Sequence, residues 1–274
     1  MPGINRRAMD KARDLPADAV VFDLEDAVAP AAKSEAREAV VAQLAAGGYG
    51  QRRLVVRVNA LDTPWGEDDL SAFAQTDVST LCIPKVESAQ AVAAVCAVLK
   101  EHGRDDIALW PMIETPPGVV NSLEIAQHQA VDTLVMGTTD LSSALRVPHR
   151  PDRLGLQYAL SQVVMAARCH NKIALDGVSL VLDDDAAFTA VCEQGLALGF
   201  TGKTLIHPRQ IAPANTVFSP SAKEIDDARR LLAAWDEAAA EGKGVAVLDG
   251  RLIEVMHIDD ARRVLAVAER LASS

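Results

Sequence analysis

The chain has 274 residues, a length that suits one large domain or two modest ones and allows a single α/β barrel of about 250 residues. Hydrophobic residues make up 49% of the sequence, which excludes a disordered chain because there is ample material for a core. The 38 acidic residues outnumber the 27 basic ones, so the formal net charge of −11 disfavours a nucleic-acid or anionic-membrane partner. A small anionic ligand is still compatible with this charge, since one buried arginine can override the overall field locally.

The sequence carries no sign of a secretory or membrane protein. Its first residues lack a signal-peptide pattern, and no apolar run approaches the roughly 18 residues of a membrane-spanning helix. The cysteines, Cys82, Cys96, Cys169 and Cys192, lack the spacing of a metal or redox site, so we interpret them as reduced core thiols. We therefore expect a cytoplasmic enzyme or binding protein.

Short apolar runs alternate with longer alanine-rich stretches along most of the chain. The predicted strands are 19–24, 54–58, 80–84, 107–113, 133–137, 173–176 and 202–206. The predicted helices between them are 34–46, 89–102, 118–129, 155–170 and 185–198. This alternation predicts a parallel sheet with both faces covered by helices.

Two architectures fit this pattern. A closed barrel has eight strands, and the missing one would precede residue 1, because the chain opens on a loop and helix over residues 3–14. An open, doubly wound sheet is the alternative. No glycine-rich phosphate turn follows any predicted strand, so a nucleotide-binding version of that sheet is disfavoured.

The alternation ends after Pro208, which indicates a separate C-terminal region. Ser221 followed by Glu224 reads as a capping box that opens a helix to about residue 240. A short apolar run at 245–248 and a final helix over 258–271 follow. We predict two domains, residues 1–218 and an extension over residues 219–274.

Acidic residues follow several of the predicted strands, at the end where parallel α/β proteins carry their functional groups. The charged residues expected at this edge are Asp23, Glu25, Asp26, Arg57, Lys85, Glu114 and Asp140. Glu114 and Asp140 follow neighbouring strands, and carboxylates packed so closely repel each other unless a cation lies between them. Oxygen ligands without histidine or cysteine favour Mg²⁺. The competing interpretation of Asp140 is a helix N-cap.

Histidine and serine offer few candidates for catalysis. His207 follows the last predicted strand and is a candidate site residue. The other histidines fall in helices or connecting loops, and no serine occupies a nucleophile elbow.

Several segments, in order and nearly end to end, resemble the citrate lyase β-subunit/malyl-CoA lyase family, the CoA-ester lyases of the HpcH/HpaI aldolase superfamily. These segments are 17–28 (ADAVVFDLEDAV), 56–66 (VRVNALDTPWG), 83–88 (IPKVES), 113–116 (IETP), 137–141 (GTTDL) and 199–208 (GFTGKTLIHP).

The resemblance implies a TIM (β/α)8 barrel that uses Mg²⁺ for Claisen-type chemistry. It implies cleavage or formation of a 3-hydroxyacyl thioester, such as malyl-CoA, citramalyl-CoA or citryl-CoA, with an acyl-CoA and an α-keto acid on the other side of the reaction. The partners implied are the thioester, on CoA or an acyl-carrier protein, and a small α-keto acid. A homotrimer or homohexamer is also implied.

The same resemblance assigns roles at the strand ends. Glu114 and Asp140 resemble the metal ligands, and Glu25 and Asp26 resemble groups that hold water near the metal. Arg57 resembles the residue that faces the substrate oxygens and neutralises charge on the thioester oxygen.

Further positions resemble the family's substrate-binding residues. The expected substrate contacts are Arg57, Lys85, the backbone of Gly137 and Thr138 for the keto-acid carboxylate, and the loops of Asp176 and His207 for the CoA arm.

The acid/base of this family is a carboxylate in the C-terminal segment that reaches a neighbouring subunit's barrel. Glu254 stands at that position, where the family usually has aspartate, and Asp249 is the fallback. Such a group would protonate the enolate carbon left by bond cleavage.

The chain departs from the family at its start, because it opens inside the Pro2-Gly3-Ile4-Asn5 motif that normally follows the first strand. We therefore expect a barrel that lacks most of this strand. Three alternative functions stay open: a malyl-CoA thioesterase with the same site, an aldolase for free keto acids, and a catalytically inactive paralogue kept for assembly.

Overall fold

The computed structural model describes residues 1–240, 242 and 244–272, and the chain divides into two compact units. The first unit is Met1–Ala214 and the second is Asn215–Ser274. None of the described helices is long and apolar enough to cross a membrane.

The first unit is built on a parallel sheet of seven strands whose order in space is their order in the chain. The strands are β1 (Ala19–Asp23), β2 (Arg53–Arg57), β3 (Thr80–Ile83), β4 (Ala108–Ile113), β5 (Thr133–Met136), β6 (Ile173–Asp176) and β7 (Gly202–Lys203). Every parallel connection passes through helical segments, as crossover connections require. The curled sheet confirms the predicted α/β class and is consistent with a TIM-like barrel.

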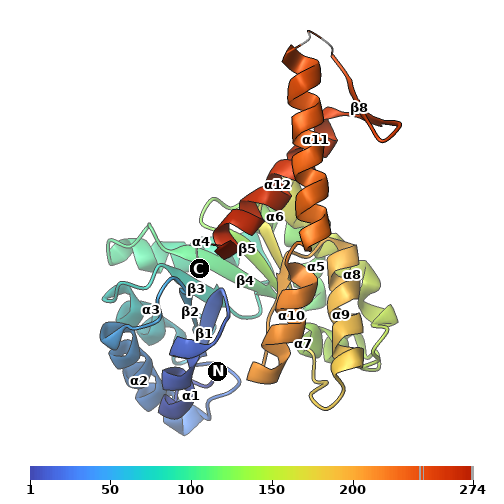
Figure 1. Cartoon of the computed structure of the whole chain (residues 1–274). Coiled ribbons are helices and arrows are strands. Elements are labelled where there is room, and N and C mark those ends of the chain that lie inside the picture. Colours follow the sequence, from blue (N-terminus) through green and yellow to red (C-terminus); the bar gives the residue numbers. More distant parts are fainter. Residues whose placement is uncertain (241, 243, 273–274) are drawn as a thin grey trace. The chain divides into compact units, whose positions relative to one another are not determined.

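Helices flank this sheet (Figure 1). They are α1 (Arg6–Lys11), α2 (Lys33–Ala46), α3 (Gly66–Ala74), α4 (Ala89–Glu101), α5 (Pro116–Val120), α6 (Ser122–Gln127), α7 (Thr138–Leu145), α8 (Gln157–Cys169), α9 (Asp185–Leu198) and α10 (Ile211–Phe218). Short 3₁₀ turns lie at Ala12–Asp14, Pro30–Ala32, Leu154–Leu156 and Pro208–Gln210.

The first residues of the chain lie along the free side of β1. The Met1 ammonium donates to the Val21 carbonyl at 2.8 Å, and the N–H of Gly3 donates to the Asp23 carbonyl at 2.8 Å. Pro2 forms an isolated parallel bridge with Asp23. These residues therefore occupy the place where the sequence predicts the end of a first barrel strand.

Two predicted elements differ most from the structure, and the ends of the others shift by no more than three residues. The strand predicted at 202–206 is only Gly202–Lys203, because the N–H of Ile206 turns to the side chain of Gln210. The helix predicted at 118–129 begins earlier, at Pro116, and is divided at Asn121, which ends α5 and precedes α6.

Alternate side chains of neighbouring strands form the interior of the curled sheet. The buried residues that pack together there, from β2 to β5, are Val55, Cys82, Trp110 and Val135. Side chains two positions apart on a strand point to the same face, so Arg57 follows Val55 on this face and Met112 follows Trp110. The side chains of Arg57 and Met112 therefore continue this packed interior toward the carboxyl edge of the sheet.

The cysteines are free thiols. Cys82 and Cys192 are buried and Cys96 is partly buried, which fits the predicted core thiols. Cys169 is exposed at the end of α8, so its predicted place in the core is wrong.

A buried ion cluster joins the ends of β6 and β7. Arg153 donates from Nη1 to both carboxylate oxygens of Asp176 at 2.7 Å, and Lys203 Nζ lies 3.0 Å from Asp176 Oδ2. Burial lowers the pKa of Lys203, although the charge of Asp176 opposes this shift. The carboxylate of Asp176 is fully buried, so it neutralises two cations inside the protein.

The second unit is a helical hairpin with a small β-hairpin. Its elements are α11 (Ala222–Ala240), β8 (Ala246–Leu248), β9 (Arg251–Ile253) and α12 (Val255–Ala272). Ser221 and Glu224 form the predicted capping box, with Ser221 Oγ accepting from the Glu224 N–H at 3.2 Å and Glu224 Oε2 accepting from the Ser221 N–H at 2.8 Å. A core of alanine and isoleucine residues, among them Ala238 and Ile258, packs inside this unit.

Replacing Asp176 with asparagine should destabilise the protein strongly, because Arg153 and Lys203 would stay buried without a counter-charge. We expect a loss of about 3–5 kcal/mol in the free energy of unfolding, measured by urea denaturation at neutral pH. The matched control is Asp185→Asn, which removes an exposed carboxylate 3.2 Å from Arg209 and should cost about 0–1 kcal/mol. Equal urea midpoints for Asp176→Asn and the wild type would refute the assigned role.

Candidate active site

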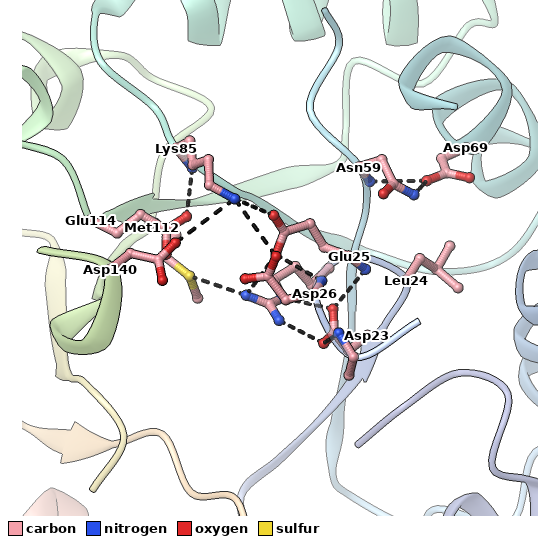
Figure 2. A network of polar contacts seen from close by, with 12 residues as sticks. Asp23, Leu24, Glu25, Asp26, Asn59, Asp69, Lys85, Met112, Glu114 and Asp140 are labelled. Carbon is pink, nitrogen blue, oxygen red and sulfur yellow. Dashed lines mark hydrogen bonds and ion pairs between the residues drawn. The ribbon is translucent and has the colours of Figure 1, made fainter. Parts of the chain in front are cut away.

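The charged residues predicted at the strand ends converge at the carboxyl edge of β1 to β5 (Figure 2). Asp23 ends β1, and Glu25 and Asp26 lie in the loop that follows. Lys85 follows β3, and Glu114 follows β4. Asp140 lies in the first turn of α7, directly after β5. The parallel sheet therefore brings together residues that are up to 117 positions apart in the sequence (Asp23 to Asp140, 140 − 23).

Asp23 and Arg57 form a bidentate ion pair across β1 and β2. Arg57 Nε donates to Asp23 Oδ1 at 2.7 Å, and Nη2 donates to Oδ2 at 2.6 Å. Burial alone would raise the pKa of Asp23, but the hydrogen bonds and charge of Arg57 together hold it below its ordinary value. The pair stays ionised and forms a rigid floor for the site.

Glu25 is held from two sides. Its Oε2 lies 3.1 Å from Arg57 Nη1, and its Oε1 accepts from Lys85 Nζ at 2.5 Å. Lys33, itself buried, donates from Nζ to the backbone carbonyls of Leu24 and Glu25 at 2.8 Å. The loop after β1 is thus fixed, and Glu25 is a shared acceptor for two cations.

Glu114 is a buried carboxylate, with only 3% of the residue exposed. Its Oε1 accepts from the backbone N–H of Lys85 at 2.8 Å. Burial raises its pKa to about 7, and the charges of Asp140 and Glu25 act in the same direction while the N–H of Lys85 opposes them. An added cation would relieve this penalty.

Gly137 leaves the space that Glu114 fills. A Cβ atom at this position would lie 2.3 Å from Glu114 Cβ and 2.4 Å from Glu114 Oε2. The N–H of Gly137 donates to the Ile113 carbonyl at 3.0 Å, so it is already engaged. Glycine is therefore required because the backbone between β5 and α7 packs closely against the Glu114 side chain.

The donor set at this edge suits Mg²⁺. Glu114 and Asp140 offer carboxylate oxygens, which Mg²⁺ prefers, and one or two protein carboxylates are usual for this ion. Within residues 1–240, 242 and 244–272, no three His, Cys, Asp or Glu side chains converge in a metal-holding group. Instead, Lys85 Nζ lies 3.8 Å from Asp140 Oδ2.

Other predicted site residues lie further from this cluster or make structural contacts. Thr138 is buried, and its hydroxyl donates to the Val178 carbonyl at 3.0 Å. The carboxylate of Asp176 is enclosed by Arg153 and Lys203, so contact with a CoA arm would fall to the backbone of its loop. His207 is exposed and accepts from the Arg209 N–H through Nδ1 at 3.2 Å.

Glu254 and Asp249 belong to the second unit, and both are exposed. The N–H of Glu254 contacts His257 Nδ1 at 3.0 Å, and Asp249 Oδ2 accepts from Arg230 Nη2 at 2.7 Å. Their role as acid/base for a neighbouring subunit stays a prediction.

A cavity of about 640 Å³ opens beside the acidic cluster. Its lining includes Glu25, Asp26, Lys33, Asn59, Trp65 and Lys85. Lys33 Nζ lies 5.2 Å from the centre of the Trp65 ring. The backbone and side-chain amides of Asn59 both donate to the buried Asp69 (Figure 2). The sequence did not predict roles for Lys33, Asn59 and Asp69. The 56–66 segment, which contains Asn59, was the signal that could have pointed to this side of the cavity.

The family model for HpcH/HpaI aldolase/citrate lyase matches residues 1–208. The chain belongs to this family. The resemblance inferred from the sequence is therefore confirmed.

Members of the HpcH/HpaI aldolase/citrate lyase family match the chain over nearly its whole length. A (3S)-malyl-CoA thioesterase of Cereibacter sphaeroides (strain KD131) is 47% identical over 273 residues, covering 100% of the chain and 94% of the relative. The citrate lyase subunit beta of Escherichia coli (strain K12) is 36% identical over 276 residues, covering 98% and 91%. The crystal structure of CitE from Mycobacterium tuberculosis, in complex with magnesium, acetoacetate and coenzyme A, has a TM-score of 0.78 at 29% identity, covering 98% and 96%.

These relatives support the predicted use of Mg²⁺ but do not distinguish between a lyase and a thioesterase. Magnesium is present in the CitE structure, which supports the predicted Mg²⁺ dependence of the family. The relatives are named both thioesterase and citrate lyase subunit, so the predicted lyase class stays a prediction. The individual residue roles and the trimer or hexamer also stay predictions.

Replacing Gly137 with alanine should displace Glu114, because the new methyl group would overlap that side chain. We expect the magnesium affinity of the Gly137→Ala variant, measured by calorimetric titration, to fall at least tenfold, while its far-UV circular dichroism stays unchanged. The control is Gly103→Ala, at a site where a Cβ meets nothing within 4 Å, although its positive φ of 73° carries a small cost in stability. Unchanged magnesium affinity in Gly137→Ala would contradict the proposed packing role.

Replacing Glu114 with glutamine should change how stability depends on pH. In the metal-free wild type the pKa of Glu114 is about 7, against an ordinary 4.5. The folded state then binds the proton more tightly, so its stability falls as pH rises from about 4.5 to 7. At pH 8 in EDTA, Glu114→Gln should be more stable than the wild type by about 1–3 kcal/mol.

Added magnesium should reverse this order, because glutamine supplies no charge to hold the ion. Urea denaturation at pH 5 and pH 8, with EDTA or with magnesium, measures both effects. A glutamine variant that magnesium stabilises as much as the wild type would exclude Glu114 as a ligand.

Proposed function

We propose that this protein hydrolyses the thioester of (3S)-malyl-CoA, or of a closely related 3-hydroxyacyl-CoA, in a Mg²⁺-dependent reaction. The observation that supports this most is the 47% identity, over the whole chain, to a (3S)-malyl-CoA thioesterase. The identity to the citrate lyase subunit beta is 36%. The acidic edge of the sheet agrees with the proposal, because it suits a divalent cation and lies beside a cavity.

Glu114 and Asp140 would hold Mg²⁺, which when bound polarises carbonyl oxygens and makes water more acidic. The two carboxylates differ in exposure: Glu114 is packed against Gly137, whereas Asp140 is partly exposed on α7. One ligand would therefore be fixed before the ion arrives, and the other would adjust to it.

Hydrolysis also needs a group that orients water and accepts its proton. Glu25 is fixed by Arg57 and Lys85, so it would orient a water molecule rather than move. The side chain of Asp26 is 58% exposed and is the carboxylate of this cluster with the most access to solvent. We assign the proton-accepting role to Asp26.

The cations of the site would bind the anionic parts of the substrate. Arg57 is bound to Asp23 through Nε and Nη2, and its Nη1 contacts Glu25 and Met112, so it would act on a ligand mainly through its charge. Lys85 has greater freedom, with 43% of its side chain exposed. The N-terminus of α7, at Thr138, supplies partial positive charge for a carboxylate.

Carbon–carbon cleavage is the second candidate. The likeness to citrate lyase subunit beta, and to a CitE structure that contains acetoacetate and coenzyme A, favours it. This reaction leaves a thioester enolate whose carbon must be protonated, a role proposed for Glu254, or for Asp249, from a neighbouring subunit. Thioester hydrolysis needs no such step.

Product analysis distinguishes the two reactions. With (3S)-malyl-CoA and Mg²⁺ we expect free CoA and malate in equal amounts, and we expect EDTA or Asp140→Asn to lower turnover at least a hundredfold. Chromatography of the acids and a thiol assay for CoA measure these products, and Asp185→Asn is the surface control.

Two other results of the product analysis would contradict the proposal. Acetyl-CoA and glyoxylate without malate would overturn the thioesterase in favour of the lyase. Absence of turnover on malyl-, citramalyl- and citryl-CoA would favour the inactive paralogue.

A further inference from the structure

Lys85 contacts more of the acidic cluster than any other single residue in Figure 2. Its Nζ lies 2.5 Å from Glu25 Oε1, 3.8 Å from Asp26 Oδ1 and 3.8 Å from Asp140 Oδ2. Its backbone N–H donates to Glu114 Oε1 at 2.8 Å. One residue thus reaches both proposed magnesium ligands.

The backbone of Lys85 adopts a conformation that permits both contacts. Its φ is 51°, in the left-handed region where glycine is favoured and a lysine is uncommon. A strained conformation of this kind persists only where surrounding contacts hold it, and such positions cluster at functional sites. The N–H bond to Glu114 and the ammonium contact with Glu25 supply those holding contacts.

The ammonium therefore contacts the same group of carboxylates that a divalent cation would neutralise. Asp23 is already paired with Arg57, which leaves Glu25, Asp26, Glu114 and Asp140 to share the Lys85 ammonium and one contact from Arg57. A Mg²⁺ ion held by Glu114 and Asp140 would repel an ammonium located 3.8 Å from Asp140. The two cations cannot both keep these positions at low cost.

We propose that Lys85 is the internal counter-cation of the metal-free site and that Mg²⁺ displaces its ammonium from Asp140. The displaced side chain, which already lines the 640 Å³ cavity, is then free to pair with an anionic group of the substrate. This inference rests on the proposed function in one respect, the use of Glu114 and Asp140 as magnesium ligands. It adds that metal binding releases a substrate-binding cation, so metal binds before substrate.

Two variants separate the ammonium of Lys85 from its backbone. Lys85→Met removes the charge and keeps a long side chain, and Lys85→Gly removes the charge and suits the positive φ while keeping the N–H to Glu114. Both should bind Mg²⁺ about tenfold more tightly than the wild type in calorimetric titration of metal-free protein without substrate. Lys100→Met, at an exposed position on α4, is the matched control and should match the wild type.

Each outcome of the titration supports or overturns the proposal. Tighter binding in both variants supports it. Unchanged or weaker binding in both overturns it. Tighter binding in only one variant also overturns it, because the loss of the ammonium, which both variants share, would then not explain the gain. Wild-type protein that binds no Mg²⁺ at all would instead refute the metal site of the proposed function.

Wild-type protein provides a second measurement that needs no folded variant. Amine acetylation followed by mass spectrometry reports how available Lys85 is to the reagent. Addition of Mg²⁺ should increase acetylation of Lys85 several-fold and leave Lys100 unchanged. Equal acetylation of Lys85 with and without Mg²⁺ would overturn the displacement.

Discussion

The candidate active site depends on an excess of negative charge at one edge of a parallel sheet, which the surrounding side chains must neutralise. Asp23, Glu25, Asp26, Glu114 and Asp140 meet there, and Arg57 and Lys85 form ion pairs with their carboxylates. Carboxylates so close together repel one another, and each buried one also loses hydration. The local structure is therefore organised around neutralising them, and the residual negative charge favours a divalent ion.

The site has a rigid inner part and an adjustable outer part. The inner part is the Asp23–Arg57 pair with Glu114, which packs against Gly137 on top of the sheet interior. The outer part is formed by Lys85 and Asp140, together with Asp26, which have substantial access to solvent. Rigid ligands reduce the ordering needed when an ion binds, while exposed groups can follow a substrate that enters and leaves.

Sequence reasoning placed β1 to β6 well, because each is a short run of mostly apolar residues, whereas β7 is shorter than predicted. It also predicted that the acidic residues lie at one edge of the sheet, because the carboxyl ends of parallel strands meet at the same edge. It could not foresee the two contacts of Lys85, which depend on a left-handed backbone at a single residue. Asp176 was predicted at a ligand wall, but its partner Arg153 lies in a distant loop that no periodic pattern connects to it.

The thiol of Cys82 lies directly beneath this edge, paired in register with Arg57 on the neighbouring strand. Burial raises its pKa to about 12, so at neutral pH it stays protonated and a poor nucleophile. Cys169, by contrast, is exposed at the end of α8. A maleimide-linked fluorophore would therefore react first at Cys169 and leave Cys82, beneath the acidic cluster, unmodified, so the native protein can be labelled for optical titration without engineered cysteines.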